Sequence, residues 1–261
     1  GVQTCALPIS LGAFSGYSNQ GSGSISIGYQ SGYTDQQTNA ISLGYYSGYQ
    51  NQEQDGISIG TNAGYDGQKS YSIAIGYQAG SSNQDANSIA IGNAAGNIEQ
   101  YDNAIAIGYN AGKNNQQPHS IAIGYRSGLI AQQSEAIAIG YNAGLANQGM
   151  NSIAIGNSAG TSSQFAGSII LNASGSVLNA SNAGFFVDPI RFDNTDGYAL
   201  HYDSINKEIV ASEFPLLDMQ YIDGPYYPSA NKWRILIVIK ATGVPYTAYL
   251  PSSPKIGRAH V

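Results

Sequence analysis

Three kinds of short segment contain residue types that could bind a phosphate, bind a metal ion or carry a glycan. Gly108–Asn114 places glycines beside a lysine, but it lacks the spacing of a phosphate loop and the Ser or Thr after the lysine. Asp193–Gly197 holds two aspartates without the alternating ligands and distal glutamate of a calcium loop. We interpret both segments as turns. Asn172 and Asn179 each begin the short and common Asn-x-Ser pattern of glycosylation acceptors.

The residues that most often carry catalysis form no constellation. His119 and His201 have no serine or cysteine partner in view, so no triad is predicted. The acidic residues are scattered and do not recur at facing positions, as a fibre-borne depolymerase would require: Asp35, Glu53, Asp55, Asp66, Asp85, Glu99, Asp102 and Glu135. We therefore predict no catalytic residue, no cofactor and no metal site, and expect that the protein is not an enzyme.

The composition favours a weakly charged, repetitive β structure. Only 10% of the 261 residues are charged, against about 25% in an ordinary domain, whereas Gly (33) and Tyr (20) are abundant. A net charge of -6 argues against a nucleic-acid partner. The longest apolar run, Ile235–Ile239, is far shorter than the roughly 18 residues of a membrane span, so we expect no membrane insertion by this fragment.

A period of 16 residues runs through more than half of the chain. An isoleucine recurs from Ile25 to Ile169, and a second aliphatic residue follows two positions later, from Ile27 to Leu171. Two glycine columns stand four residues apart. A glutamine column completes the frame, and its central members are Gln36, Gln52, Gln68, Gln84, Gln100, Gln116, Gln132 and Gln148. Such a period predicts a repeat architecture.

Each repeat is interpreted as one coil of an all-β parallel β-solenoid. Ile-Ala-Ile is predicted as a short strand, with both isoleucines inward and the small residue outward. Glycine then allows a turn, Tyr-x-Ala is predicted as a second short strand, and the polar residues return the chain. Coils stacked about 4.8 Å apart would give about ten coils a length of roughly 48 Å.

Equal positions of a solenoid stack into ladders. We predict that the glutamines form a structural amide ladder. The tyrosines that follow the first glycine form an aromatic column, for which a structural role and a glycan-binding role both stay open. The candidate surface contacts in this column are Tyr45, Tyr77, Tyr109, Tyr125 and Tyr141.

The apolar content of one coil favours an oligomer. Burial of the two isoleucines, the alanine and the tyrosine of one coil would offset only about half of the conformational-entropy cost of ordering that coil. We therefore expect an assembly of identical chains. The candidate contact face is the small column that we predict to point outward: Ala74, Ala90, Ala106 and Ala122.

Two nonapeptides carry a resemblance to a known family. SIAIGYQAG (Ser72–Gly80) and AIAIGYNAG (Ala136–Gly144) resemble the head repeats of YadA-type trimeric autotransporter adhesins. Similar repeats occur in fibres of phages and giant viruses, and the coil length with its glutamine column favours these viral relatives. The resemblance implies a left-handed parallel β-roll, a homotrimer, and a place outside the cell, on a cell or virion surface.

Five segments are expected. Residues 10–172 form the repeat region, residues 173–212 a β connector, and residues 213–254 a truncated β module. Residues 1–9 and 255–261 resemble translated sequencing adapter, because one DNA fragment encodes parts of both in opposite orientations, and they are excluded from the fold.

Three functions were weighed. The leading one is a structural and adhesive fibre whose repetitive polar surface attaches to a host glycan, a protein receptor or another surface. The alternative is a passive shaft of a viral or phage fibre whose binding or chaperone domain lies elsewhere. An ice-binding solenoid is disfavoured, because no threonine column exists.

Overall fold

The computed structural model describes residues 7–190 and 199–212. The chain divides into two units, Gly1–Arg191 and Phe192–Val261, which are described separately. Within the described residues every regular element is a β-strand. No helix long and apolar enough to cross a membrane is found in this part of the chain.

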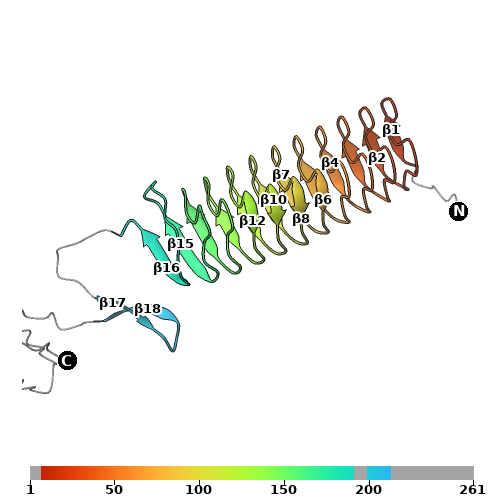
Figure 1. The fold of residues 1–261 in the computed structure, drawn as a ribbon. Helices are drawn as coiled ribbons and strands as arrows, with labels where there is room; N and C mark the ends of the chain where they lie inside the picture. The colour runs from red at the N-terminus through yellow and green to blue at the C-terminus, as the bar shows by residue number, and fades with distance from the viewer. Residues whose placement is uncertain (1–6, 191–198, 213–261) are drawn as a thin grey trace, which may run out of the picture. The chain divides into compact units, whose positions relative to one another are not determined.

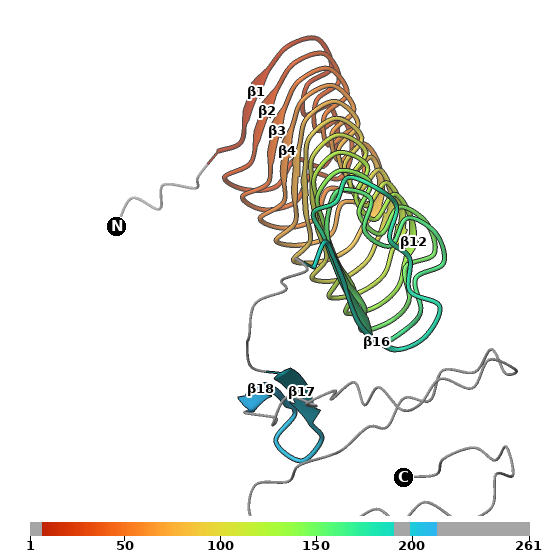
Figure 2. The ribbon, with the colours of Figure 1, turned by 90° about the vertical axis from the view of Figure 1, so that its left-hand side faces the viewer.

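The first unit is a solenoid whose coils repeat along one axis, as Figures 1 and 2 show. One strand from each coil joins a parallel sheet of 12 strands in the order β1-β2-β3-β4-β5-β7-β9-β11-β13-β14-β15-β16. Its strands are β1 (Ile9–Leu11), β2 (Ile25–Ile27), β3 (Ile41–Leu43), β4 (Ile57–Ile59), β5 (Ile73–Ile75), β7 (Ile89–Ile91), β9 (Ile105–Ile107), β11 (Ile121–Ile123), β13 (Ile137–Ile139), β14 (Ile153–Gly156), β15 (Ser168–Asn172) and β16 (Gly184–Asp188).

The register of this sheet follows from the constant repeat length. Ile89 pairs with Ile105 and Ala90 with Ala106, so each residue lies beside the residue 16 positions along the chain. The same offset holds from Ile9–Ile25 to Ser168–Gly184. The prediction of an all-β parallel solenoid with 16-residue coils is confirmed.

Four coils have a second strand, and it does not lie at the predicted Tyr-x-Ala segment. A four-stranded parallel sheet consists of β6 (Ser82–Gln84), β8 (Ile98–Gln100), β10 (Asn114–Gln116) and β12 (Ile130–Gln132). The predicted Tyr-x-Ala strand is instead a turn, because Gly76, Gln78 and Gly80 all have positive φ, at 129°, 53° and 50°. Residues in that region of backbone space cannot continue an extended strand.

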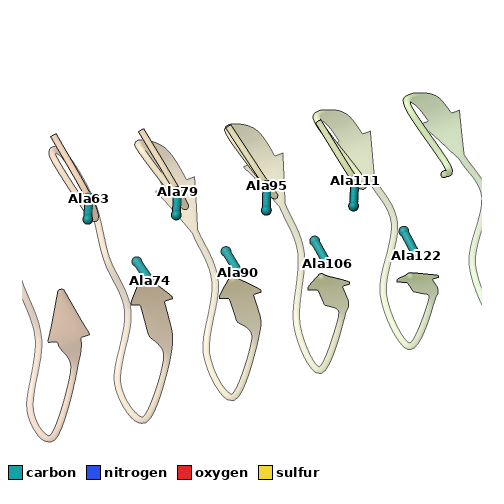
Figure 3. Close-up of a cluster of buried hydrophobic side chains, with 8 residues drawn as sticks. All are labelled: Ala63, Ala74, Ala79, Ala90, Ala95, Ala106, Ala111 and Ala122. Carbon is teal, nitrogen blue, oxygen red and sulfur yellow. The ribbon is translucent and has the colours of Figure 1, made fainter. Parts of the chain in front are cut away.

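The predicted direction of the strand side chains was wrong. The alanines expected to face outward (Ala74, Ala90, Ala106 and Ala122) are fully buried, whereas the flanking isoleucines are only partly buried. Figure 3 shows these alanines directed toward Ala63, Ala79, Ala95 and Ala111, which belong to the turns. A Cβ built on Gly80 would lie 3.2 Å from the Cβ of Ala74. The interior is therefore too thin to hold isoleucine side chains.

The ends of the solenoid also differ from the expected boundaries. Ile9, which was assigned to the flanking segment, pairs with Ile25 in the first coil. The parallel sheet continues past residue 172, because β16 pairs with β15 over its whole length. Ile170 replaces alanine in the inner column there, and Leu178 and Phe186 pack against its cluster. Larger apolar side chains thus close this end of the core.

The second unit contains one antiparallel hairpin within the described residues. β17 (Ala199–Asp203) pairs with β18 (Glu208–Ser212). The Asp203 carboxylate accepts hydrogen bonds from the backbone N–H groups of Ile205 and Asn206 and thereby closes the turn. The expected turn at Asp193–Gly197 and the module at 213–254 lie outside the described residues.

The first glycine column is required by the close approach of neighbouring coils. A Cβ at Gly92, where φ is +129°, would lie 2.6 Å from the carbonyl oxygen of Gly108. Gly92→Ala should therefore lower the free energy of unfolding by about 2 kcal/mol or more, through strain and displacement of the next coil. Gly175→Ala is the control, because φ there is also positive but no atom lies within 4 Å. Equal losses for both variants in chemical unfolding would contradict this explanation.

Candidate functional site

The glutamine column lies inside the solenoid, where each side chain is fully or almost fully buried from Gln36 onward. Each Nε2 donates to the Oε1 of the glutamine in the next coil, for example over 3.0 Å from Gln36 to Gln52 and from Gln100 to Gln116. Such links run without a gap from Gln20 to Gln148. The structure thus places all eight predicted ladder residues in one hydrogen-bonded column.

The glutamine side chains also connect the two walls of each coil. Gln84 Nε2 donates to the carbonyl oxygen of Ile73 at 2.9 Å, in the opposite strand of the same coil. In the first coils a serine in that strand adds a bond, as when Ser42 Oγ donates to Gln52 Oε1 at 2.6 Å. From Ala74 onward alanine occupies the serine position, so this extra bond is lost. A buried amide needs such partners, because leaving it unpaired is costly.

The ladder ends at Gln148. Its Nε2 donates to the carbonyl oxygens of Ile137 and Ser152. The buried Oε1 of Gln164 has no hydrogen-bond partner. In this last coil the Nε2 of Gln164 still donates to the carbonyl oxygen of Ile153 and to Ser168, but it is not linked to Gln148.

Two adjacent glutamines allow a matched test of the ladder. Gln132→Leu removes the amide that donates to Ile121, Ala136 and Gln148 and leaves buried polar groups unpaired. We expect it to lower the free energy of unfolding by about 2–4 kcal/mol. Gln133→Leu, at the exposed neighbouring position, should change it by less than about 0.5 kcal/mol. Chemical denaturation of both variants measures the difference, and equal stabilities would refute a structural role for the ladder.

The predicted tyrosine contacts lie on the outside of the solenoid. Tyr45, Tyr77, Tyr109, Tyr125 and Tyr141 are between 43% and 53% exposed. The rings of Tyr109, Tyr125 and Tyr141 stack in sequence with centroids 5.2 Å apart. Tyr77 stands between coils that carry Thr61 and Asn93 at this position. These side chains are accessible, and where they are neighbours they also pack on one another.

A second tyrosine column was missed. Tyr17, Tyr33, Tyr49 and Tyr65 follow the second glycine of the first coils, and their rings stack with centroid distances of 4.9–5.0 Å. Its 16-residue spacing was visible in the sequence. It was overlooked because later coils carry Ser81, Asn97, Lys113 or Leu129 at this position.

Tyr46 joins the two tyrosine columns. Its ring meets that of Tyr45 edge-on at 4.3 Å and that of Tyr49 at 5.2 Å. A hydrogen bond with Tyr45, followed by desolvation and the neighbouring phenols, raises the pKa of Tyr46 to about 12. Desolvation and then the phenols of Tyr65 and Tyr33 raise the pKa of Tyr49. The first four coils therefore carry a continuous aromatic surface.

The other segments considered for chemistry are structural. Asn172 is buried, and its amide donates to the carbonyl oxygens of Asn157 and Ser176, so it cannot accept a glycan in the folded chain. Asn179 is exposed. Residues 108–113 connect β9 to β10 through a turn, and Asn114 is the first residue of β10. Among the described residues no group of three or more His, Cys, Asp or Glu side chains is placed to hold a metal ion.

The coil sequence matches a known family over residues 69–95, where two copies of the YadA head domain repeat are found. The chain contains YadA head repeats. The matched segment includes β5, β7 and the second-wall strand β6. Coils before and after it continue in the same 16-residue register. Comparisons with curated proteins and with solved structures found no match.

Proposed function

We propose that this protein is part of a trimeric, YadA-type adhesive fibre that lies on a cell or virion surface. The YadA head repeats support this proposal, since they are of a structural, adhesin type. The fibre presents the outer walls of its coils to a host glycan, a protein receptor or another surface. We infer the trimer from the aliphatic face of the 12-stranded sheet, which nothing within this unit covers completely.

This aliphatic face consists of the outward isoleucines and leucines of the 12-stranded sheet, from β2 to β15. In each of β2, β3, β4, β5, β7, β9, β11 and β13, two aliphatic residues flank a buried Ser or Ala and remain partly exposed. Ile155, Ile169 and Leu171 extend the rows and are 37–39% exposed. A continuous apolar strip of this length is typical of an interaction surface. Association of three copies through this aliphatic face would remove it from water.

The trimer contact is therefore proposed at the isoleucines, and the alanine column fills the interior of each coil. Ile121→Glu should convert the trimer to monomers, because a carboxylate would be buried in each contact. Ile130→Glu is the matched control, because Ile130 points outward from the second sheet and is 45% exposed. Sedimentation equilibrium of the full chain measures the mass. Trimers for Ile121→Glu, or a monomeric parent at micromolar concentration, would contradict the proposed contact.

Adhesion is assigned to the wall that carries the tyrosines. This wall combines exposed phenols with Asn, Gln and Ser and carries few charges. Binding by such a wall should be weak for each coil, multivalent, and little affected by salt.

A cell-adhesion assay with the full chain tests this assignment. One variant replaces four tyrosines with serine: Tyr77, Tyr109, Tyr125 and Tyr141. It should lose most of its adhesion while its mass and melting temperature stay close to those of the parent. Tyr71→Ser, at an exposed turn position outside the tyrosine columns, should adhere normally. A parent that adheres to nothing at any valency would show that the fragment is a passive shaft.

The shaft remains the second candidate because of one observation. The rings of Tyr109, Tyr125 and Tyr141 face one another within the column, so part of their area stabilises the stack. Unfolding of the four-tyrosine variant would favour this structural role.

A further inference from the structure

A polar cavity of about 330 Å³ opens on the second wall of the first coils. Its lining is mixed in charge and rich in hydrogen-bonding groups. The side chains that matter here are Asp35, Asn51, Glu53, Asp66, Lys69 and Asn83.

The cavity lining includes Gly67, the one glycine in a column whose other members carry side chains. Asn51 and Asn83 occupy equal positions in their coils, both with left-handed backbone (φ 56° and 54°). The coil between them has Gly67 at this position, with φ 72°. An asparagine would fit that conformation, as it does in both neighbours. A Cβ at Gly67 would lie 3.1 Å from Oδ1 of the flexible Asn83 side chain, so an asparagine at this position would shift Asn83 and take up part of the opening.

The polar groups around this space are held in place. Lys69 Nζ donates to Glu53 Oε1 at 3.0 Å, and Ser70 donates to the other carboxylate oxygen from both its N–H and its hydroxyl. Partial burial alone would raise the pKa of Glu53, but these bonds outweigh it and the pKa is lowered. Asn51 Nδ2 donates to Asp66 Oδ1 at 3.2 Å. Carboxylate and amide oxygens with free acceptor capacity thus line the opening.

The stacked tyrosines lie on the same wall as the cavity. Tyr65 directly precedes Asp66, and Tyr49 stands two residues before Asn51. The residues between the tyrosines and the cavity, including Gln50 and Asp66, form a ladder of parallel bridges along this wall. The stacked tyrosines are therefore close in sequence to the residues that line the opening.

We propose that this cavity and the tyrosine stack form a binding site for a neutral saccharide. Vicinal hydroxyls would donate to the carboxylates and amides, while C–H groups pack against the tyrosines, the usual combination of a few polar groups with aromatic surface. The carboxylates of Asp35, Glu53 and Asp66 outnumber the single ammonium group of Lys69. An anionic sugar would therefore be repelled by the net negative charge of the lining. The inference rests on the proposed function and names a ligand class and one further place of attachment beside the tyrosine wall of the later coils.

The site also fits the proposed assembly. The glutamine side chains cross from the second wall to the isoleucine-bearing sheet, so the outer surfaces of the two walls point away from each other. Three chains joined through their isoleucines would leave all three cavities open to solvent. Weak saccharide binding would then be strengthened by valency.

Filling the space tests the site. The full chain is applied to an array of neutral oligosaccharides, including chito- and cello-oligosaccharides, with sialyllactose and heparin fragments as anionic probes. Saccharides retained are then titrated in solution. Gly67→Asn should weaken binding by about tenfold or more, with the trimer and melting temperature unchanged.

Ala131→Asn is the matched control, because it places the same side chain at the same column position, with φ 53°, four coils away. It should bind like the parent. Equal binding by parent and Gly67→Asn would overturn the inference, as would retention of anionic probes alone. If no neutral saccharide binds but cells are still bound, the site is refuted and the adhesive function stands. Loss of both would contradict the proposed function as well.

Discussion

Hydrogen bonding of a buried glutamine in every coil is the constraint on which the rest of this solenoid depends. The amide has two N–H groups and an oxygen that must find partners away from water. The opposite strand of its own coil and the next glutamine provide them, as Gln52 shows with Ile41 and Gln68. Inserting one residue would move the amide out of this column and break bonds on both sides. The constant repeat of 16 residues follows from that requirement.

The same amide column makes the coils thin. Alanines and serines fill the remaining interior, and the two walls approach until a side chain on Gly80 would touch Ala74. Large aliphatic residues therefore lie outside on the 12-stranded sheet, except in the last coils, where Ile170 enters the core. A single chain therefore has a polar and small-residue core and an apolar outer face, which is the reverse of an ordinary domain. This reversal is why we place the trimer contact on the isoleucines.

The coils are alike in backbone but not in chemistry. The first four combine serines inside with stacked tyrosines outside, and the cavity beside Gly67 lies at the end of this region. Later coils have alanine inside and more varied outer residues. The backbone tolerates such changes because the ladder and glycine columns are kept. Surface chemistry can thus vary along the fibre while its architecture stays constant.

The sequence by itself determined the repeat length, the parallel stacking, the glutamine column and the YadA-like coil, because each follows from residues at fixed spacing. It could not decide which face of Ile-Ala-Ile points inward. Alternation in a strand is equally satisfied by either direction, and the usual preference for buried isoleucine gave the wrong answer. The tertiary structure decided it, because the buried glutamines and the turns leave space only for methyl groups. The second strand, the joining role of Tyr46 and the cavity at Gly67 likewise arise only when neighbouring coils are stacked.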